Sequence, residues 1–341
     1  MIVLGIESSC DDTSVGIFDS REGLLSNVVS SQIKLHEEWG GVYPELAARE
    51  HTKNITSVLD IALKEANKNI KDIDVISATI TPGLIVSLVI GSSVAKTLSA
   101  VLDKPFVPVH HIEAHIFANF IEKKEDYPFI ALVVSGGHTE LYLVEEFGKY
   151  RLLGKTIDDA VGEAYDKVAR ILNLGFPGGP IIDKLARKGT PSIHLPKPLS
   201  RKKSEHRFNF SFSGLKTAVL REVEKNKLCK PEDIACSFQE TAVEILVEKT
   251  LDAVKTFNIK KIVVAGGVSA NSRLRERLNE EAKKEGIEVD FPHLSLCTDN
   301  GAMVAFAGYK RFLKKQSGYS LLIETKAKIP LEKFEEYINS F

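Results

Sequence analysis

Two segments of this 341-residue chain share one plan, in which an apolar run, a turn of small polar residues and a second apolar run follow one another. Residues 2–19 have this plan around a turn at 8–13. Residues 129–144 repeat it around a turn at 135–139. Strand-length apolar runs separated by a short turn predict a β-hairpin. A hairpin at the start of each half indicates a duplicated fold, and the chain is long enough for two domains.

Strands and helices alternate through the rest of the chain. An apolar, β-branched run at 75–79 predicts a buried strand, and a small-residue helix follows it through residue 102. In the second half, a buried strand at 261–265 leads into a helix that ends near residue 284. This alternation predicts an α/β architecture.

Three turns of small residues could hold a phosphate or another anion. They lie at 8–13, at 135–139 and at 266–271, and the last one opens a helix. Glycine lets the backbone approach a ligand closely, and amides at turns and helix starts attract anions. Three such turns on a duplicated α/β plan resemble the actin, Hsp70 and sugar-kinase (ASKHA) superfamily. That resemblance implies two lobes with a ligand in the cleft between them.

We expect three parts in the chain. Residues 1–127 would form an N-terminal ASKHA lobe, residues 128–310 a C-terminal lobe, and residues 311–341 a helical tail that packs back on the N-terminal lobe.

The composition is that of a soluble, cytoplasmic protein. Hydrophobic residues make up 43% and charged residues 27% of the chain, and the formal net charge is -1. The four cysteines are scattered without a Cys-x-x-Cys pair, which is typical of a reducing compartment. The first residues lack the basic segment of a signal peptide. Ser, Gly and Lys96 interrupt the apolar run at 84–102, so we expect a buried helix and no membrane span.

A pair of histidines indicates a metal site. His111 and His115 are four residues apart, so a helix would place both imidazoles on one face. Two imidazoles in this arrangement are good ligands for a divalent transition metal. A zinc protease would also need a glutamate beside the metal, but Glu113 is rotated by about 200° from each histidine. The spacing therefore supports a metal and argues against a protease.

Eight groups of residues resemble one family in identity and order. Besides the histidine pair they are Gly5–Thr13, Val134–Thr139, Asp158–Lys167, Phe176–Pro180, Phe210–Lys216, Ala265–Asn271 and Cys297–Ala302. Together they resemble the bacterial TsaD family of tRNA threonylcarbamoyladenosine transferases, once described as O-sialoglycoprotein endopeptidases. The resemblance extends from the first residues to about residue 310.

The resemblance implies an acyltransferase. It would move the threonylcarbamoyl group of threonylcarbamoyl-AMP to N6 of adenosine 37 in tRNAs that read codons beginning with A. The family pattern assigns a metal, iron(2+) in most cases and zinc(2+) in some, to His111, His115 and Asp299. The residues that it assigns to the threonylcarbamoyl-AMP pocket are Val134, Ser135, Gly136, Gly137, His138, Asp166, Gly179, Asp183 and Asn271.

This reaction has clear chemical requirements. Two imidazoles and one carboxylate leave open positions on a metal, which can then polarise the carbonyl under attack. A base must also remove a proton from the incoming amine. Asp11 or Asp12, on the first turn, is our candidate for that role; the alternative is that both only cap the turn or hold water. Without the family pattern, Asp166 would be interpreted as a solvated acid.

Nucleic-acid binding is the function that composition supports least. The near-neutral chain has one basic run, at 197–207, and such runs are often only solvated surface. We therefore expect partners to share the tRNA contacts. The family resemblance implies TsaB, docked on the N-terminal half, the ATPase TsaE, and a separate synthase that supplies threonylcarbamoyl-AMP.

Two other classes of function remain open. An ATPase or small-molecule kinase of the same superfold would bind ATP and Mg²⁺ and would have no use for the histidine pair. A non-catalytic scaffold would keep a metal without open coordination positions.

Overall fold

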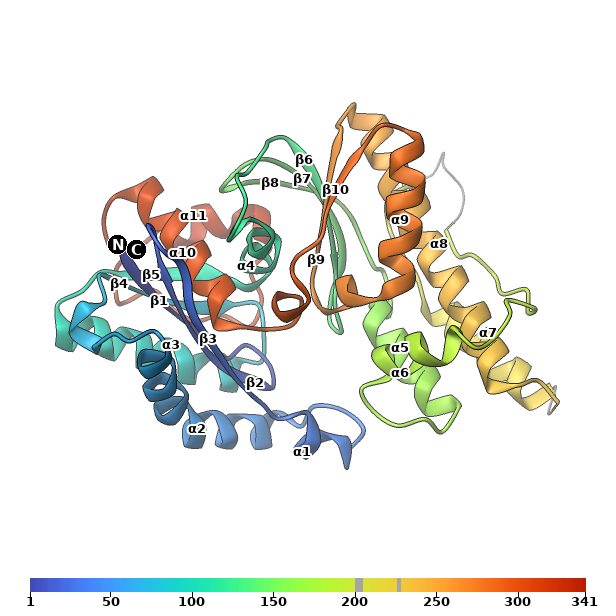
Figure 1. Cartoon of the computed structure of the whole chain (residues 1–341), viewed down its shortest axis with the longest axis horizontal. Coiled ribbons are helices and arrows are strands. Elements are labelled where there is room, and N and C mark those ends of the chain that lie inside the picture. Colours follow the sequence, from blue (N-terminus) through green and yellow to red (C-terminus); the bar gives the residue numbers. More distant parts are fainter. Residues whose placement is uncertain (200–204, 226–227) are drawn as a thin grey trace. The chain divides into compact units, whose positions relative to one another are not determined.

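The computed structural model describes residues 1–199, 205–225 and 228–341, which form two compact units (Figure 1). The first unit contains Met1–Glu125 and Thr298–Phe341, and the second contains Asp126–Cys297. The first boundary lies two residues from the expected one. The second boundary differs from the expectation, because residues 298–310 belong to the first unit and not to the C-terminal lobe.

The sheet of the first unit has five strands in the order β3-β2-β1-β4-β5. β1 pairs with β2, and β2 with β3, in antiparallel fashion, whereas β1–β4 and β4–β5 are parallel. The strands are β1 (Ile2–Glu7), β2 (Asp12–Asp19), β3 (Gly23–Ser31), β4 (Val75–Thr81) and β5 (Phe106–His110).

The sheet of the second unit repeats this arrangement in the order β10-β9-β6-β7-β8. β6–β7 and β7–β8 are antiparallel, and β6–β9 and β9–β10 are parallel. The strands are β6 (Phe129–Val134), β7 (Thr139–Glu146), β8 (Lys149–Lys155), β9 (Lys261–Ala265) and β10 (Glu288–Asp290). The predicted hairpins and the duplicated α/β fold are therefore confirmed.

Helices pack on each sheet. Those of the first unit are α1 (Ile33–Glu37), α2 (Pro44–Glu65), α3 (Ile85–Leu102), α4 (His111–Phe117), α10 (Gly301–Lys315) and α11 (Phe334–Ile338). Those of the second unit are α5 (Val161–Ile171), α6 (Gly178–Ala186), α7 (Ser213–Lys225), α8 (Pro231–Phe257) and α9 (Ser272–Lys284).

Helix α10 belongs to the first unit because it packs directly on β1, β2 and β4. Glycines allow the close approach: a Cβ atom on Gly5 would lie 2.2 Å from the backbone nitrogen of Ala305, and one on Gly301 would lie 2.1 Å from that of Gly16. The start of α10 is also hydrogen-bonded to the strand, since the Gly301 amide donates to Ser14 Oγ at 2.7 Å. The residues just before α10 are thereby fixed beside the first sheet.

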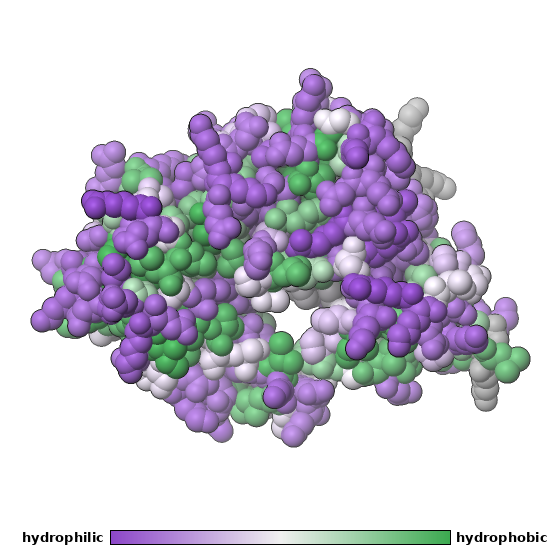
Figure 2. Space-filling model, in the orientation of Figure 1, coloured by the Kyte–Doolittle hydropathy of each residue, from purple (hydrophilic) through white to green (hydrophobic). Residues whose placement is uncertain are grey.

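Helix α3 is long and apolar enough to cross a membrane by length and composition, but a third of it is buried in this fold. Its small residues, among them Gly91 and Ala95, are buried, and the helix packs on β4, β1 and α2. Ile85, Val86 and Val89 are exposed. The prediction of a buried helix therefore holds for one face only. Hydrophilic residues predominate on the face of the protein that Figure 2 shows.

The tail after α10 is mostly irregular and runs along the first sheet. The Tyr319 amide donates to the Phe106 carbonyl at 2.8 Å, and the Lys326 amide donates to the Ile80 carbonyl at 3.1 Å. A 3-10 turn at Leu331–Lys333 and the short helix α11 interrupt this segment, where we expected a helical tail.

The close approach of α10 predicts a stability effect. In Gly16→Ala the new methyl group would lie 2.3 Å from the Ala302 nitrogen, so β2 and α10 must separate. We expect a loss of about 2 kcal/mol in the free energy of unfolding, measured by urea denaturation. Gly41→Ala is the matched control, because a methyl group there meets nothing within 4 Å. Equal stability of the two variants would contradict this packing.

Candidate functional site

The histidine pair lies on α4, as its spacing predicted. β5 ends at His110, and His110 Nδ1 accepts a hydrogen bond from the Ile112 amide at 3.2 Å, which caps the helix. Every residue of α4 is buried. The rings of His111 and His115 meet edge to face with their centroids 4.5 Å apart.

Asp299 completes a cluster of three metal-binding side chains. Its Oδ1 lies 3.0 Å from His115 Nε2 and 3.6 Å from His111 Nε2. The ligand atoms of the three residues all lie within 4.8 Å of one another. An ion that binds such ligands at about 2.1 Å can contact atoms with these separations. Two buried imidazoles and a carboxylate that is 22% exposed therefore fit a divalent metal with one accessible side.

Glu7 orients His111 from the side opposite the ligand atom. Its Oε2 lies 3.2 Å from His111 Nδ1 and accepts a hydrogen bond from Thr79 Oγ1 at 2.7 Å. A carboxylate on Nδ1 leaves Nε2 for a metal, which is the usual arrangement around metal-bound histidine. Glu7 had no predicted role, although an acid at the end of an apolar strand is a sequence signal for one.

The charges of Glu7 and His111 depend on each other. Burial disfavours the charged form of His111, but the carboxylates of Asp299 and Glu7 raise its pKa to about 9. Burial raises the pKa of Glu7, yet the charge and hydrogen bond of His111 bring that pKa below its usual value. Without a metal the imidazole is therefore protonated at neutral pH, and a divalent cation would compete with that proton.

Asp11 and Asp12 lie where the first turn enters β2. Burial, followed by the nearby charge of Asp299, raises the pKa of Asp12 to about 7. The pKa of Asp11 is also raised, mainly by burial. Asp12 Oδ1 is buried and has no hydrogen-bond partner among the residues that the structure describes. Asp12 is thus a carboxylate with a free acceptor and a pKa close to neutral.

His51 of α2 supports this turn and was missed in the sequence analysis. Its Nδ1 lies 2.7 Å from Thr13 Oγ1, and its Nε2 lies 2.9 Å from the Cys10 carbonyl oxygen. Nothing in its local sequence pattern distinguished it.

The second unit places the turn at 135–139 between β6 and β7. Ser135 Oγ accepts a hydrogen bond from the His138 amide at 3.0 Å. Gly136 and Gly137 are exposed, with open space around them. Val134, by contrast, is fully buried in the core, so only its backbone is available to a ligand.

Other candidate residues of the second unit make hydrogen bonds near the ends of helices. Asp166 Oδ1 accepts a hydrogen bond from the Gly178 amide at 2.7 Å, next to Gly179 in the first turn of α6. Burial raises the pKa of Asp166, so it is not the solvated acid that its local sequence suggested. The Gly162 amide of α5 donates to the Ser135 carbonyl at 3.2 Å and joins this helix to the turn.

Asp183 of α6 and Asn271 each make a hydrogen bond at the start of α9. Asp183 Oδ1 accepts a hydrogen bond from Ser272 Oγ at 2.7 Å. Asn271 caps α9 by accepting from the Leu274 amide at 2.9 Å, and its Nδ2 donates to Gln239 Oε1 at 2.9 Å. Asp183 and Asn271 thus each have a structural contact in addition to the role that the family pattern implies.

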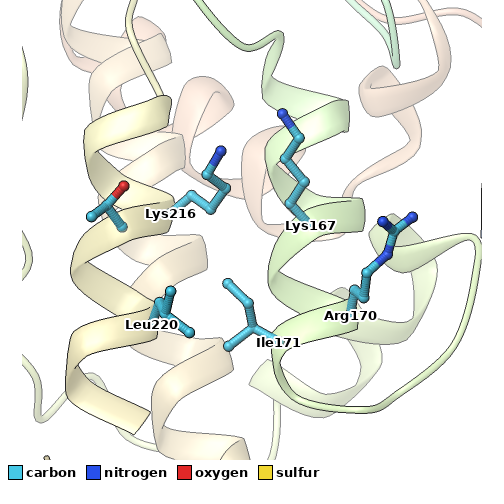
Figure 3. Close-up of a pocket in the computed structure, with 6 residues that line it drawn as sticks. Lys167, Arg170, Ile171, Lys216 and Leu220 are labelled. Carbon is cyan, nitrogen blue, oxygen red and sulfur yellow. The ribbon is translucent and has the colours of Figure 1, made fainter. Parts of the chain in front are cut away.

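A cavity of 290 Å³ lies between α5 and α7 and contains none of the candidate residues. Figure 3 shows Lys167 and Arg170 on one helix and Lys216 on the other. The two lysines pair with Asp159, at 2.8 and 3.1 Å, so their charge is partly neutralised.

The basic run at 197–207 is less available than its sequence suggested. Lys197 pairs with Glu244, and Arg207 pairs with Asp252 at 2.6 Å. Its residues 200–204 lie outside the described part of the chain.

The duplicated sheets define a two-lobed protein of the ASKHA fold class, with a His–His–Asp cluster in the first unit. Solved structures share this fold. Full-length HypF aligns over 94% of the chain and 47% of its own length, with a TM-score of 0.64 and 15% identity. Component A of (R)-2-hydroxyglutaryl-CoA dehydratase from Acidaminococcus fermentans aligns over 91% of the chain and 98% of its own length, with a TM-score of 0.55 and 15% identity.

The chain belongs to the TsaD family of tRNA N6-adenosine threonylcarbamoyltransferases, whose sequence model matches residues 23–306. A relative of that name from Persephonella marina is 66% identical over 99% of the chain and 98% of its own length. Another relative of that name, from Sulfurihydrogenibium, is 60% identical over 100% of the chain and 99% of its own length. The protein is therefore an acyltransferase that modifies tRNA, and its family implies a metal and a nucleotide-related substrate.

Proposed function

We propose that this enzyme takes the threonylcarbamoyl group from threonylcarbamoyl-AMP and transfers it to N6 of adenosine 37, in cytoplasmic tRNAs that read codons beginning with A. One divalent metal would be held by His111, His115 and Asp299. The observation that carries this proposal is the convergence of their three ligand atoms within 4.8 Å. Two imidazoles and one carboxylate without thiolate favour iron(2+), with zinc(2+) as the alternative.

The donor is a mixed anhydride with its own leaving group. The metal, when bound, would polarise the carbamoyl carbonyl. The exposed amides of Gly136 and Gly137 are suited to an anionic oxygen of the donor. We assign the adenylate to this turn together with Ser135, His138, Asp166, Gly179, Asp183, Asn271 and the backbone of Val134. ATP could occupy the same residues, since it shares the adenylate.

Transfer itself is the test of this proposal. The protein, threonylcarbamoyl-AMP, unmodified tRNA and the partner proteins are incubated, and threonylcarbamoyl-adenosine is measured by mass spectrometry. We expect product with the parent protein and a loss of at least about 100-fold in rate with His111→Ala/His115→Ala, because metal-assisted polarisation is worth several kcal/mol.

The control is His194→Ala, an exposed histidine of the second unit. Equal loss in the control would indicate a general defect. Product formation by the double variant at the parent rate would contradict the metal assignment. No product with active partners, accompanied by ATP turnover, would favour the ATPase or kinase alternative.

We infer that Asp12, or failing it Asp11, takes the proton that N6 loses. The N6–carbon bond forms, the carbon–oxygen bond to AMP breaks, and the proton passes to the carboxylate. Asp12 is the stronger candidate because of its free buried acceptor and its raised pKa.

This role predicts a pH dependence. A base acts in its deprotonated form, so kcat/KM should rise with pH through the pKa of Asp12, which is about 7 without a metal, and level off above that pKa. A bound cation beside Asp299 offsets the charge of that carboxylate and shifts the rise to lower pH. Asp12→Asn should lower kcat by about 100-fold or more and remove this rise, with metal affinity retained. If Asp12 only caps the turn, Asp12→Asn keeps the parent rate and pH profile, and Asp11→Asn is examined next.

We propose that a TsaB-type partner docks on the exposed apolar face of α3. Ile85, Val86 and Val89 are each more than 40% exposed, on a helix whose other face packs on the sheet. A contiguous apolar face of this kind is typical of a protein–protein interface. A TsaE-type ATPase and a synthase for threonylcarbamoyl-AMP would complete the system.

A charge on this face should prevent docking. Val86→Glu/Val89→Glu is expected to weaken binding of the TsaB-type partner, measured by calorimetry, by at least about 10-fold without changing the unfolding midpoint. Leu322→Glu, at a residue that is 82% exposed in the tail, is the matched control. Unchanged affinity of the α3 variant would place the partner elsewhere.

A further inference from the structure

Arg311 of α10 is a fully buried cation with two acidic partners. Its Nη2 donates to both oxygens of Glu113, at 2.6 and 2.7 Å, and its Nη1 donates to Glu335 at 2.7 Å. Glu113 is also fully buried. A charge removed from water in this way requires close counter-charges, so these residues depend on one another.

The pair of Glu113 and Arg311 joins the two elements that carry the metal ligands. Glu113 lies between His111 and His115 on α4, and points away from the face that the histidines share. Arg311 lies on α10, which begins two residues after Asp299. The metal ligands would therefore connect α4 to the start of α10, and the ion pair connects α4 to a later turn of the same helix.

Helix α4 needs such contacts because it has only seven residues. A helix this short has no independent stability, so its rotation is set by what it packs against. Charge-assisted hydrogen bonds between a guanidinium and a carboxylate are short and directional, so the contact of Arg311 Nη2 with both oxygens of Glu113 limits the angle as well as the distance between α4 and α10. The pair is thus suited to hold the histidine face of α4 in one orientation.

The C-terminal segment 329–335 supports both ends of this arrangement. The carbonyl oxygen of Ile329 lies 3.0 Å from His110 Nε2, on the residue that caps α4. The Phe334 ring packs edge-on against His110, at 5.1 Å, and under the Arg311 guanidinium, at 4.8 Å. Through these contacts and the hydrogen bond of Glu335, the segment holds both His110, which caps α4, and Arg311, which pairs with Glu113.

We propose that Arg311 is a positioning residue for the metal centre: by pairing with Glu113 it orients the α4 face that carries His111 and His115, and segment 329–335 holds Arg311 in place. The inference rests on the proposed metal-binding function of His111, His115 and Asp299. It does not require Arg311 to contact metal or substrate.

The experiment separates positioning from stability. In Glu113→Leu/Arg311→Met both buried charges are replaced by apolar groups of similar size, which often preserves stability. The probe is Co²⁺ added to metal-free protein, with affinity measured by competition with a chelator and thermal unfolding measured in parallel. We expect an unfolding midpoint near that of the parent and a Co²⁺ dissociation constant about 10- to 100-fold higher, as for other residues that orient metal ligands.

The matched control removes another ion pair of α10. Lys310 pairs with Glu125 at 2.8 Å, and neither residue lies on α4. Lys310→Met/Glu125→Leu should bind Co²⁺ with the parent affinity. A folded Glu113→Leu/Arg311→Met protein that also binds with parent affinity would overturn the positioning role.

A third variant keeps the proposal testable if that double variant does not fold. Glu335→Gln leaves the pair of Arg311 and Glu113 in place and changes a side chain that is partly exposed. It should fold and bind Co²⁺ more weakly than the parent; unchanged affinity would overturn the role of segment 329–335. If the parent protein binds no Co²⁺, the metal proposal itself fails, and the inference fails with it.

Discussion

The close contact of α10 with β1 and β2 is the constraint on which the first unit depends. Gly5, Gly16 and Gly301 remove the side chains that would otherwise separate the helix from the sheet. Since α10 comes from the C-terminal part of the chain, this contact adds residues 298–341 to a unit that otherwise consists of the first 125. It also brings Asp299 to the two histidines of α4. A chain that lost this contact would keep the histidine pair and lose the carboxylate beside it.

The candidate site concentrates ionisable groups in a small buried region. Glu7, His111 and Asp12 are held at positions where burial alone would neutralise them. The pKa values of His111 and Asp12 are raised and that of Glu7 is lowered. The carboxylates stabilise the imidazolium of His111, burial and the charge of Asp299 destabilise the ionised form of Asp12, and His111 stabilises the carboxylate of Glu7. A divalent cation between His111, His115 and Asp299 would relieve the repulsion among the carboxylates. Metal binding would therefore release the proton of His111 and reduce this repulsion at the same time.

Local patterns predicted the features of the fold that depend on neighbouring residues. The two hairpins follow from apolar runs joined by small-residue turns, and the orientation of Glu113 away from the histidines follows from helix geometry alone. The partner of Glu113 could not be predicted in this way, because Arg311 lies 198 residues further along the chain. The membership of residues 298–310 in the first unit was missed for the same reason. Asp299 was assigned from family resemblance, since no spacing in the chain connects it to His111 and His115.

X-ray absorption at the metal edge tests directly whether two imidazoles and one carboxylate of the first unit hold a metal. The measurement would be made on metal-loaded protein and repeated on Asp299→Asn. We expect two imidazole ligands and oxygen ligands at about 2.1 Å in the parent, with a changed oxygen shell and weaker binding in the variant. Sulfur in the first coordination shell, or a spectrum without imidazole scattering, would contradict it.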